Sequence, residues 1–314
     1  MTLKKYLWPV VGGATIAVCV WLLYKELRGL SLDDVWDSLM AISHVHWLLA
    51  VLSTLVAYAA LAGYDRIALM HLGRKVNVLF VTVTSFTTYA LSHNVGASVL
   101  SGGVVRYRAY SSKGLSGREI GALVAICSFT FFLGTLLLIG MVLVLKPHIT
   151  ERFGEGFPID ASSVTGYVIL AAVGLYAAAS FLRPQPVSIG GTQLTYPSPK
   201  VVLSQLIIGP LELIGAAGII YFALPATGNP GFIIVLGIFL ASFSAALISH
   251  APGGLGVLEL VFVMGLPDMD QADVIAALLV FRLLYLMIPF AIALLVIFIF
   301  ERMQFRANQS PGEP

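Results

Sequence analysis

Long apolar stretches dominate this sequence and restrict it to one class of fold. Six of them approach or exceed the ~20 residues with which an α-helix crosses the ~30 Å hydrocarbon core of a bilayer. These stretches cover residues 7–24, 46–70, 117–145, 164–182, 200–224 and 274–300. Apolar residues form 58% of the chain and charged residues 11%, against ~45–50% and ~25% in soluble domains. We therefore expect an all-α polytopic membrane protein.

Two further apolar segments, 78–105 and 231–266, contain residues that interrupt a helix. The second contains Pro252-Gly253-Gly254, and the first contains Gly96. Proline removes a backbone donor, and glycine raises the entropic cost of a helix. In a bilayer, broken backbone survives only where protein or a wet cavity covers it. Breaks at matching places in two halves of a chain are typical of transporter binding sites, so we expect two opposed re-entrant hairpins.

The distribution of lysine and arginine predicts the orientation. With the two hairpins entering from opposite sides, 13 of the 18 basic residues lie on the N-terminal side, four on the other side, and Arg282 in the membrane. The positive-inside rule then places both termini in the cytoplasm. We expect a single transmembrane domain, 1–303, built of inverted repeats of about 1–150 and 151–303, and a polar tail, 304–314.

Two runs of residues resemble motifs of a known membrane family. They are 101–110 (SGGVVRYRAY) and 252–259 (PGGLGVLE). Both resemble the lysylphosphatidylglycerol synthase transmembrane region, the flippase half of the bacterial multiple peptide resistance factor, and the resemblance extends over residues 5–303. It implies a lipid-translocating module in the bacterial inner membrane. The aminoacyl-transferase domain of the full-length factor does not follow the last span, so we expect a protein that is not an enzyme.

The half-helices that start after each break are candidate anion sites. A helix N-terminus exposes unpaired N–H groups and a partial positive charge, which suits a phosphate. The alternative is that the glycines only permit tight helix packing. The candidate ligand-binding residues at these ends are Asn94, Gly96, Gly253, Gly254 and Gly256.

Charged residues inside the membrane are costly and are candidate functional groups. Glu212 lies ~18 Å and Arg282 ~12 Å into their spans at ~1.5 Å per residue. Arg282 could pair with Glu212 or with Glu259, and the sequence does not choose between them. Such a pair is either structural, or Arg282 binds a lipid phosphate while Glu212 sets its charge or carries a proton. Asp65 and Arg66 are expected to form a local pair.

His93 and His250 occupy corresponding positions, each after a serine at a break. Histidine can change its charge near physiological pH, or it can cap a broken helix end. Arg106 and Arg108 follow the first hairpin on the cytoplasmic side. They are either topological signals that snorkel to the interface or groups that recruit anionic headgroups.

The favoured function is translocation or binding of an anionic phospholipid or lipid-linked phosphate. The alternatives are a non-transporting scaffold for a lipid-modifying enzyme and an intramembrane enzyme that acts on lipid headgroups. No zinc-protease or serine-hydrolase signature occurs, and Cys19 and Cys127 both lie in apolar stretches. We expect no metal, no cofactor and no nucleic acid partner. The expected partners are the membrane and an anionic lipid, and a homodimer or a separate lipid-modifying enzyme is left open.

Overall fold

A computed structural model of the chain describes residues 31–95, 98–153, 163–182, 187–189, 192–194, 196–249 and 252–309. The predicted span 7–24 and the candidate residues Gly96 and His250 lie outside these ranges.

Within the described residues, six helical segments are long and apolar enough to cross a membrane. They are α3 (His44–His71), α6 (Gly117–Leu145), α7 (Ser163–Leu182), α8 (Pro199–Ala223), α9 (Phe232–Ser249) and the segment Gln271–Phe300. That last segment joins α11 (Gln271–Phe281), a π-helical turn η4 (Arg282–Met287) and the first part of α12 (Ile288–Gln309). Five of the six confirm predicted spans within a few residues. The exception, α9, is the first part of the broken segment 231–266.

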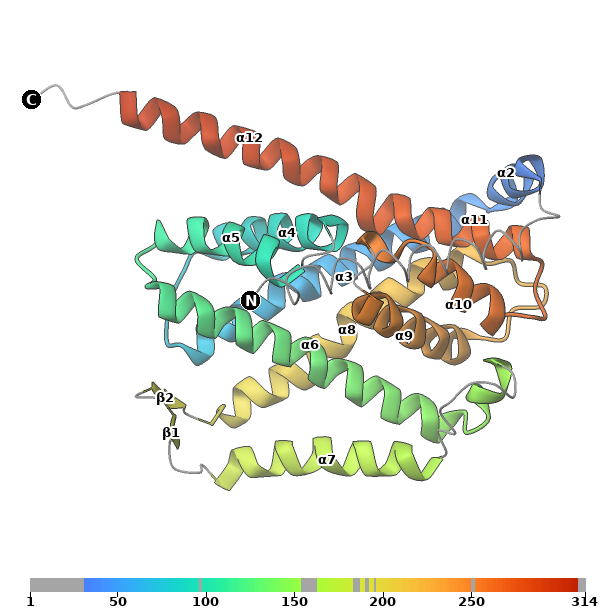
Figure 1. The fold of residues 1–314 in the computed structure, drawn as a ribbon, viewed down its shortest axis with the longest axis horizontal. Helices are drawn as coiled ribbons and strands as arrows, with labels where there is room; N and C mark the ends of the chain where they lie inside the picture. Colours follow the sequence, from blue (N-terminus) through green and yellow to red (C-terminus); the bar gives the residue numbers. More distant parts are fainter. Residues whose placement is uncertain are drawn as a thin grey trace, which may run out of the picture.

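Each broken segment folds as a pair of helices packed against each other. The first consists of α4 (Val78–Val95) and α5 (Ser98–Ser111). The second consists of α9, the short turn η3 (Pro252–Gly254) and α10 (Val257–Gly265). The two pairs extend from opposite ends of the molecule (Figure 1), and α4 contacts both η3 and η4. The broken ends therefore lie close together near the middle of the fold.

The second break is built from glycine. Gly253, Gly254 and Gly256 have φ angles of +60°, +67° and +79°. This left-handed region is strained for residues that carry a Cβ. The predicted interruption at Pro252-Gly253-Gly254 is therefore confirmed, and its cause is three positions whose backbone conformation favours glycine.

The remaining elements lie at the two ends of the molecule. Helix α2 (Leu32–Ala41) starts with a capping box between Ser31 and Asp34 and packs on α11. A 3₁₀ turn η2 (Ile149–Phe153) follows α6. The strands β1 (Val187–Ile189) and β2 (Thr192–Leu194) pair antiparallel between α7 and α8, with Val187 opposite Leu194 and Ile189 opposite Thr192.

Helix α8 is the most buried of the six spans, and glycines let its backbone touch its neighbours. A Cβ on Gly134 of α6 would lie 2.4 Å from the carbonyl carbon of Gly209 in α8. A Cβ on Gly215 of α8 would lie 2.8 Å from the backbone nitrogen of Ala57 in α3. Small residues at crossings hold membrane helices together in this way, because they allow close van der Waals packing.

The π-helical turn η4 has its own hydrogen-bond partners. Pro289 follows it and has no N–H to donate back into the turn. Side chains from other helices donate instead, the Tyr58 hydroxyl to the Tyr285 carbonyl at 2.8 Å and Asn94 Nδ2 to the Leu286 carbonyl at 3.1 Å. The turn therefore ties α3 and α4 to the α11–α12 segment. Such π turns often occur at functional sites.

Candidate functional site

A cavity of about 230 Å³ lies among α3, α4, α5, α6, α8 and α9, where the two broken pairs approach each other. Its polar lining includes His93, Arg106 and Glu212, and these three residues come from α4, α5 and α8. Aromatic rings line much of the rest. The fold thus brings together three candidate residues that are far apart in sequence.

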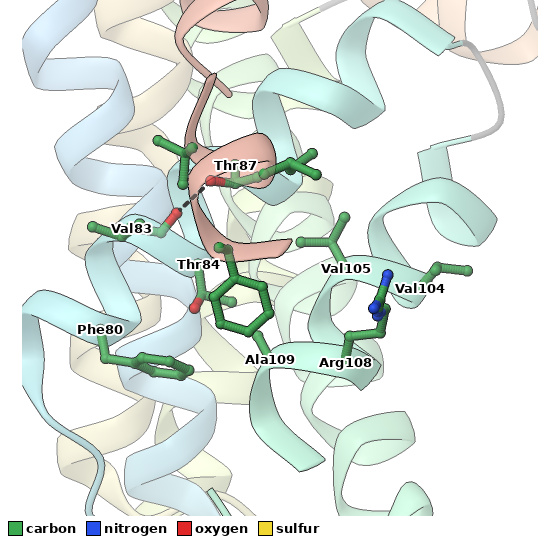
Figure 2. A pocket seen from close by; sticks show the side chains of 11 residues that line it. Phe80, Val83, Thr84, Thr87, Val104, Val105, Arg108 and Ala109 are labelled. Carbon is green, nitrogen blue, oxygen red and sulfur yellow. Dashed lines mark hydrogen bonds between the residues drawn. The ribbon is translucent and has the colours of Figure 1, made fainter. Parts of the chain in front are cut away.

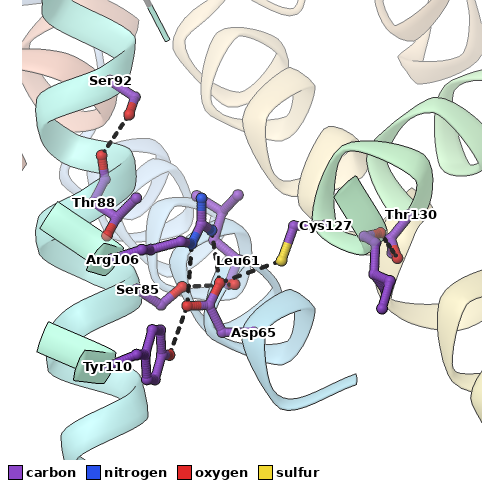
Figure 3. Close-up of polar contacts among 10 residues, drawn as sticks. Leu61, Asp65, Ser85, Thr88, Ser92, Arg106, Tyr110, Cys127 and Thr130 are labelled. Carbon is purple, nitrogen blue, oxygen red and sulfur yellow. Dashed lines mark hydrogen bonds and ion pairs between the residues drawn. The ribbon is translucent and has the colours of Figure 1, made fainter. Parts of the chain in front are cut away.

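Arg106 and Asp65 form a buried ion pair beside this cavity (Figure 3). Arg106 Nη2 lies 2.6 Å from Asp65 Oδ1, and Nε lies 3.3 Å from Oδ2. The Tyr110 hydroxyl donates to Oδ2 at 2.7 Å, and Cys127 Sγ lies 3.5 Å from Oδ1. The Tyr89 ring centroid lies 4.8 Å from the guanidinium carbon. The side chains of Arg106 and Asp65 are 6% and 0% exposed.

These contacts correct two predictions. The local pair of Asp65 and Arg66 is wrong, because successive residues on a helix point in different directions: Asp65 faces the interior, whereas Arg66 is exposed. Arg106 does not lie at the surface with Arg108. Arg108 is exposed and lines a separate, mostly apolar pocket of about 320 Å³ between α4, α5 and α12 (Figure 2).

Glu212 is 1% exposed, and within the described part of the chain only hydroxyl groups bond to it. The Tyr285 hydroxyl donates to its Oε1 at 2.5 Å. The Tyr64 oxygen lies 3.4 Å from its Oε2 and 3.1 Å from the Gly209 carbonyl oxygen. Among the described residues, no ion pair includes Glu212.

His93 lines the same cavity, and its ring stacks on Tyr285 with centroids 5.1 Å apart. Its Nδ1 atom is buried and has no hydrogen-bond partner within the described part of the chain. An unpaired buried nitrogen requires an explanation, because leaving it unsatisfied costs free energy. Neighbouring Asn94 donates to the carbonyls of Ala90 and Leu286.

A second charged cluster lies at the break between α9 and α10. Arg282 Nε donates to Glu259 Oε1 at 2.6 Å, Nη2 also contacts that oxygen, and Nη1 donates to the Gly253 carbonyl at 3.0 Å. The structure therefore decides between the two carboxylates that the sequence left open, and Arg282 pairs with Glu259 rather than with Glu212.

The same cluster changes the predicted anion site at the glycines. Glu259 Oε2 accepts the N–H of Gly256 at 2.9 Å, as an acidic residue does at the start of a helix. Arg282 donates to the Gly253 carbonyl. At Gly256, the chain's own carboxylate thus fills the position predicted for a phosphate. The proposed ligand role of Gly253 and Gly254 remains a prediction.

Sequence reasoning missed Asp65, Tyr64 and Tyr285 as site residues. One signal was available for Asp65, because a carboxylate inside the predicted span 46–70 is an intramembrane charge. The tyrosines carried no comparable signal, since tyrosine is common at membrane interfaces and in cores. Their importance follows only from which helices pack together.

Six described helical segments that are long and apolar enough to cross a membrane, packed around largely buried ion pairs, define a polytopic helical membrane protein. Residues 10–293 match the family described as the lysylphosphatidylglycerol synthase TM region. The chain belongs to this family, as its motifs at 101–110 and 252–259 suggested.

Individual relatives agree with this assignment. The chain is similar to the uncharacterized protein slr0712 of Synechocystis, with 30% identity over 98% of this chain and 95% of the relative. It is similar to the inner membrane protein YbhN of Escherichia coli, with 32% identity over 91% and 89% of the two chains. It also matches the phosphatidylglycerol lysyltransferase of Staphylococcus aureus, with 24% identity over 87% of this chain but only 32% of that protein.

The Arg282–Glu259 pair gives a double-mutant test. Glu259→Gln or Arg282→Gln alone leaves one charge unpaired at side chains that are 13% exposed, and each should lower the free energy of unfolding by about 1–3 kcal/mol. The double variant should recover most of this loss, because no unpaired charge remains. Denaturant titration of the purified protein in detergent measures the three values. A double variant as unstable as the sum of the single variants would show that the two residues act independently.

Proposed function

We propose that this protein binds an anionic phospholipid or lipid-linked phosphate and moves its headgroup between leaflets through the central cavity. The observation that carries the proposal is a buried arginine, Arg106, on the wall of a cavity lined by α4, α5 and four helices that are long and apolar enough to cross a membrane. Its Nε and Nη2 atoms are bound to Asp65, and Nη1 is the guanidinium nitrogen that Asp65 does not engage. An arginine in a low-dielectric site binds phosphate strongly.

The comparisons support an anionic lipid as the ligand. The name of the staphylococcal relative specifies phosphatidylglycerol, a lipid with a negatively charged phosphate. The similarity between that relative and this chain covers 32% of the relative. The E. coli relative is described as an inner membrane protein. We accordingly propose the bacterial inner membrane as the location of this chain.

The two broken helix pairs supply the path. In this proposal they are re-entrant hairpins of two inverted repeats, 1–150 and 151–303, with both termini in the cytoplasm. Transporters of this construction bind their substrate near the bilayer midplane, between the repeats. A cysteine placed at exposed Ser112 should react with an impermeant thiol reagent from the cytoplasmic side, and one at exposed Pro267 from the opposite side. Labelling of both positions from one side would overturn this arrangement.

Reconstitution tests the function. The purified full chain is placed in liposomes that contain fluorescent phosphatidylglycerol, and a membrane-impermeant quencher reports the leaflet of each label. We expect the wild type to exchange lipid between leaflets faster than protein-free liposomes do, and Arg106→Gln to give no acceleration. If the wild type exchanges lipid no faster than protein-free liposomes, translocation is rejected and a scaffold is favoured. Chemical analysis of the lipids after incubation would expose an enzyme as an altered headgroup.

A further inference from the structure

The carboxyl group of Glu212 has no charged partner among the described residues. Sequence reasoning offered Arg282 as its counter-ion, but Arg282 pairs with Glu259. Among the described residues, Arg106 is the one arginine or lysine on the cavity wall, and it is engaged by Asp65. A lone carboxylate in the membrane interior costs several kcal/mol, so its surroundings favour the neutral, protonated acid.

A count of hydrogens at Glu212 supports the same state. The Tyr64 hydroxyl has one hydrogen, but two oxygen atoms approach it, the Gly209 carbonyl at 3.1 Å and Glu212 Oε2 at 3.4 Å. With an ionised Glu212, one of these contacts has no hydrogen. With a protonated Glu212, Oε2 donates to Tyr64, Tyr64 donates to Gly209, and Tyr285 donates to Oε1, so that every contact is a hydrogen bond.

The groups that face Glu212 are mostly neutral. Tyr285 and Tyr64 bond to it, and helix α9, which forms part of the cavity wall, contains no titratable residue. Tyr176 of α7 bonds instead to Gln205, two turns away on α8. Asp273 lies at the start of α11, and among the described residues it forms no hydrogen bond or ion pair with Glu212. The further titratable groups near the cavity are Tyr58 and Asp65 on α3, Tyr89 and His93 on α4, Arg106 on α5 and Cys127 on α6.

We propose that Glu212 is a proton-binding site that couples headgroup movement to proton movement, an inference that rests on the proposed function. The carboxylate takes up a proton from water on one side, forming an O–H bond and removing a negative charge that would repel an anionic headgroup in the cavity. When the headgroup leaves on the other side, that O–H bond breaks and the proton passes to water there. No electrons are transferred.

The coupling has a physical benefit. Moving one elementary charge across a membrane potential of 100 mV changes its free energy by about 2.3 kcal/mol. An anionic headgroup that crosses together with a proton carries no net charge, so the potential does not oppose its movement. Glu212 and Arg106 both lie on the wall of the same cavity, as such a shared passage requires.

The test applies a pH gradient to liposomes that contain the full chain and labelled phosphatidylglycerol. For the wild type, we expect the label to move severalfold faster along the proton gradient than against it. Glu212→Gln mimics the protonated acid, and its rate of lipid movement should not depend on the pH gradient. Glu119→Gln is the matched control, because Glu119 caps α6 outside the cavity and pairs with Arg74. It should keep the dependence on the gradient.

Infrared spectroscopy of the same proteins in an ester-free detergent, where no lipid ester carbonyl overlaps the signal, provides a readout that needs no transport. A protonated carboxyl group has a carbonyl stretch distinct from that of a carboxylate, and this band should be present at neutral pH in the wild type and in Glu119→Gln but absent in Glu212→Gln. If Glu212→Gln does not fold, Glu212→Asp keeps the carboxyl group and should shift the band. A wild type that moves no lipid, even without a gradient, defeats the proposed function. If the wild type moves lipid at a rate that does not depend on the pH gradient, or lacks the carbonyl band of a protonated carboxyl group, the proton coupling is rejected while the proposed function stands.

Discussion

Arg106→Gln is expected to lower the free energy of unfolding by about 3–5 kcal/mol, because it leaves the Asp65 carboxylate buried without its counter-ion. Asp65 is fully buried, and after the substitution only Tyr110 and Cys127 remain among its bonded side chains. Asp65→Asn should cost a similar amount by leaving the guanidinium unpaired. Denaturant titration in detergent micelles measures both changes.

Two controls separate charge pairing from lipid binding. The double variant Asp65→Asn with Arg106→Gln contains no unpaired charge and should recover most of the stability, yet it should still fail to move lipid, since Arg106 is the proposed phosphate ligand. Arg74→Gln breaks an ion pair whose side chains are 48% and 24% exposed and should cost at most about 1 kcal/mol. A double variant that transports like the wild type would assign the pair a purely structural role.

Gly134→Ala is expected to be the most disruptive single methyl addition among the described glycines of the long helices. The new Cβ would lie 2.4 Å from the carbonyl carbon of Gly209 and 2.8 Å from its Cα and oxygen, all of them backbone atoms that cannot rotate away. Overpacking of this kind costs about 1–3 kcal/mol or more. The measurement is the yield and thermal stability of the purified protein.

Gly121→Ala is the matched control for this prediction. Gly121 lies on the same helix and is exposed, and apart from its own stretch of helix no heavy atom lies within 4 Å of the position that a Cβ would occupy. Alanine there should be neutral or stabilising by up to about 1 kcal/mol, because it favours the helix over glycine. Equal effects of the two substitutions would mean that the close approach of α6 and α8 is not maintained in the membrane.

The sequence was sufficient to predict five of the described membrane-length helices and the break at Pro252. Apolar length predicted α3, α6, α7, α8 and the Gln271–Phe300 segment, because spanning a bilayer imposes a minimum length that composition reveals directly. The break at Pro252 was predictable for an equally local reason, since proline and glycine act on their own stretch of backbone.

The pairing of charges was not predictable, because it depends on which helices meet. Asp65 and Arg106 are 41 residues apart, and Glu259 and Arg282 are 23 apart. Depth in the membrane suggested that Glu212 and Arg282 lie at similar heights, but height does not determine the direction in which a side chain points. Helix rotation turns Glu212 toward tyrosines and Arg282 toward the glycine break. The unpaired Nδ1 of His93 likewise emerges only from the packing around the cavity.

The glycine contacts distinguish four helices whose backbones touch, α3, α6, α7 and α8, from two helix pairs whose described glycines meet only side chains. Backbones touch at glycines where α8 crosses α3 and α6, and again where Gly166 of α7 meets the Gly140 carbonyl of α6. Helices in backbone contact cannot slide without colliding. Within the described residues, the glycines of the α4–α5 and α9–α10 pairs approach other elements only through side chains, which can change rotamer. Any motion that opens the cavity first to one side of the membrane and then to the other is therefore expected in these two pairs, swinging against four helices that stay fixed.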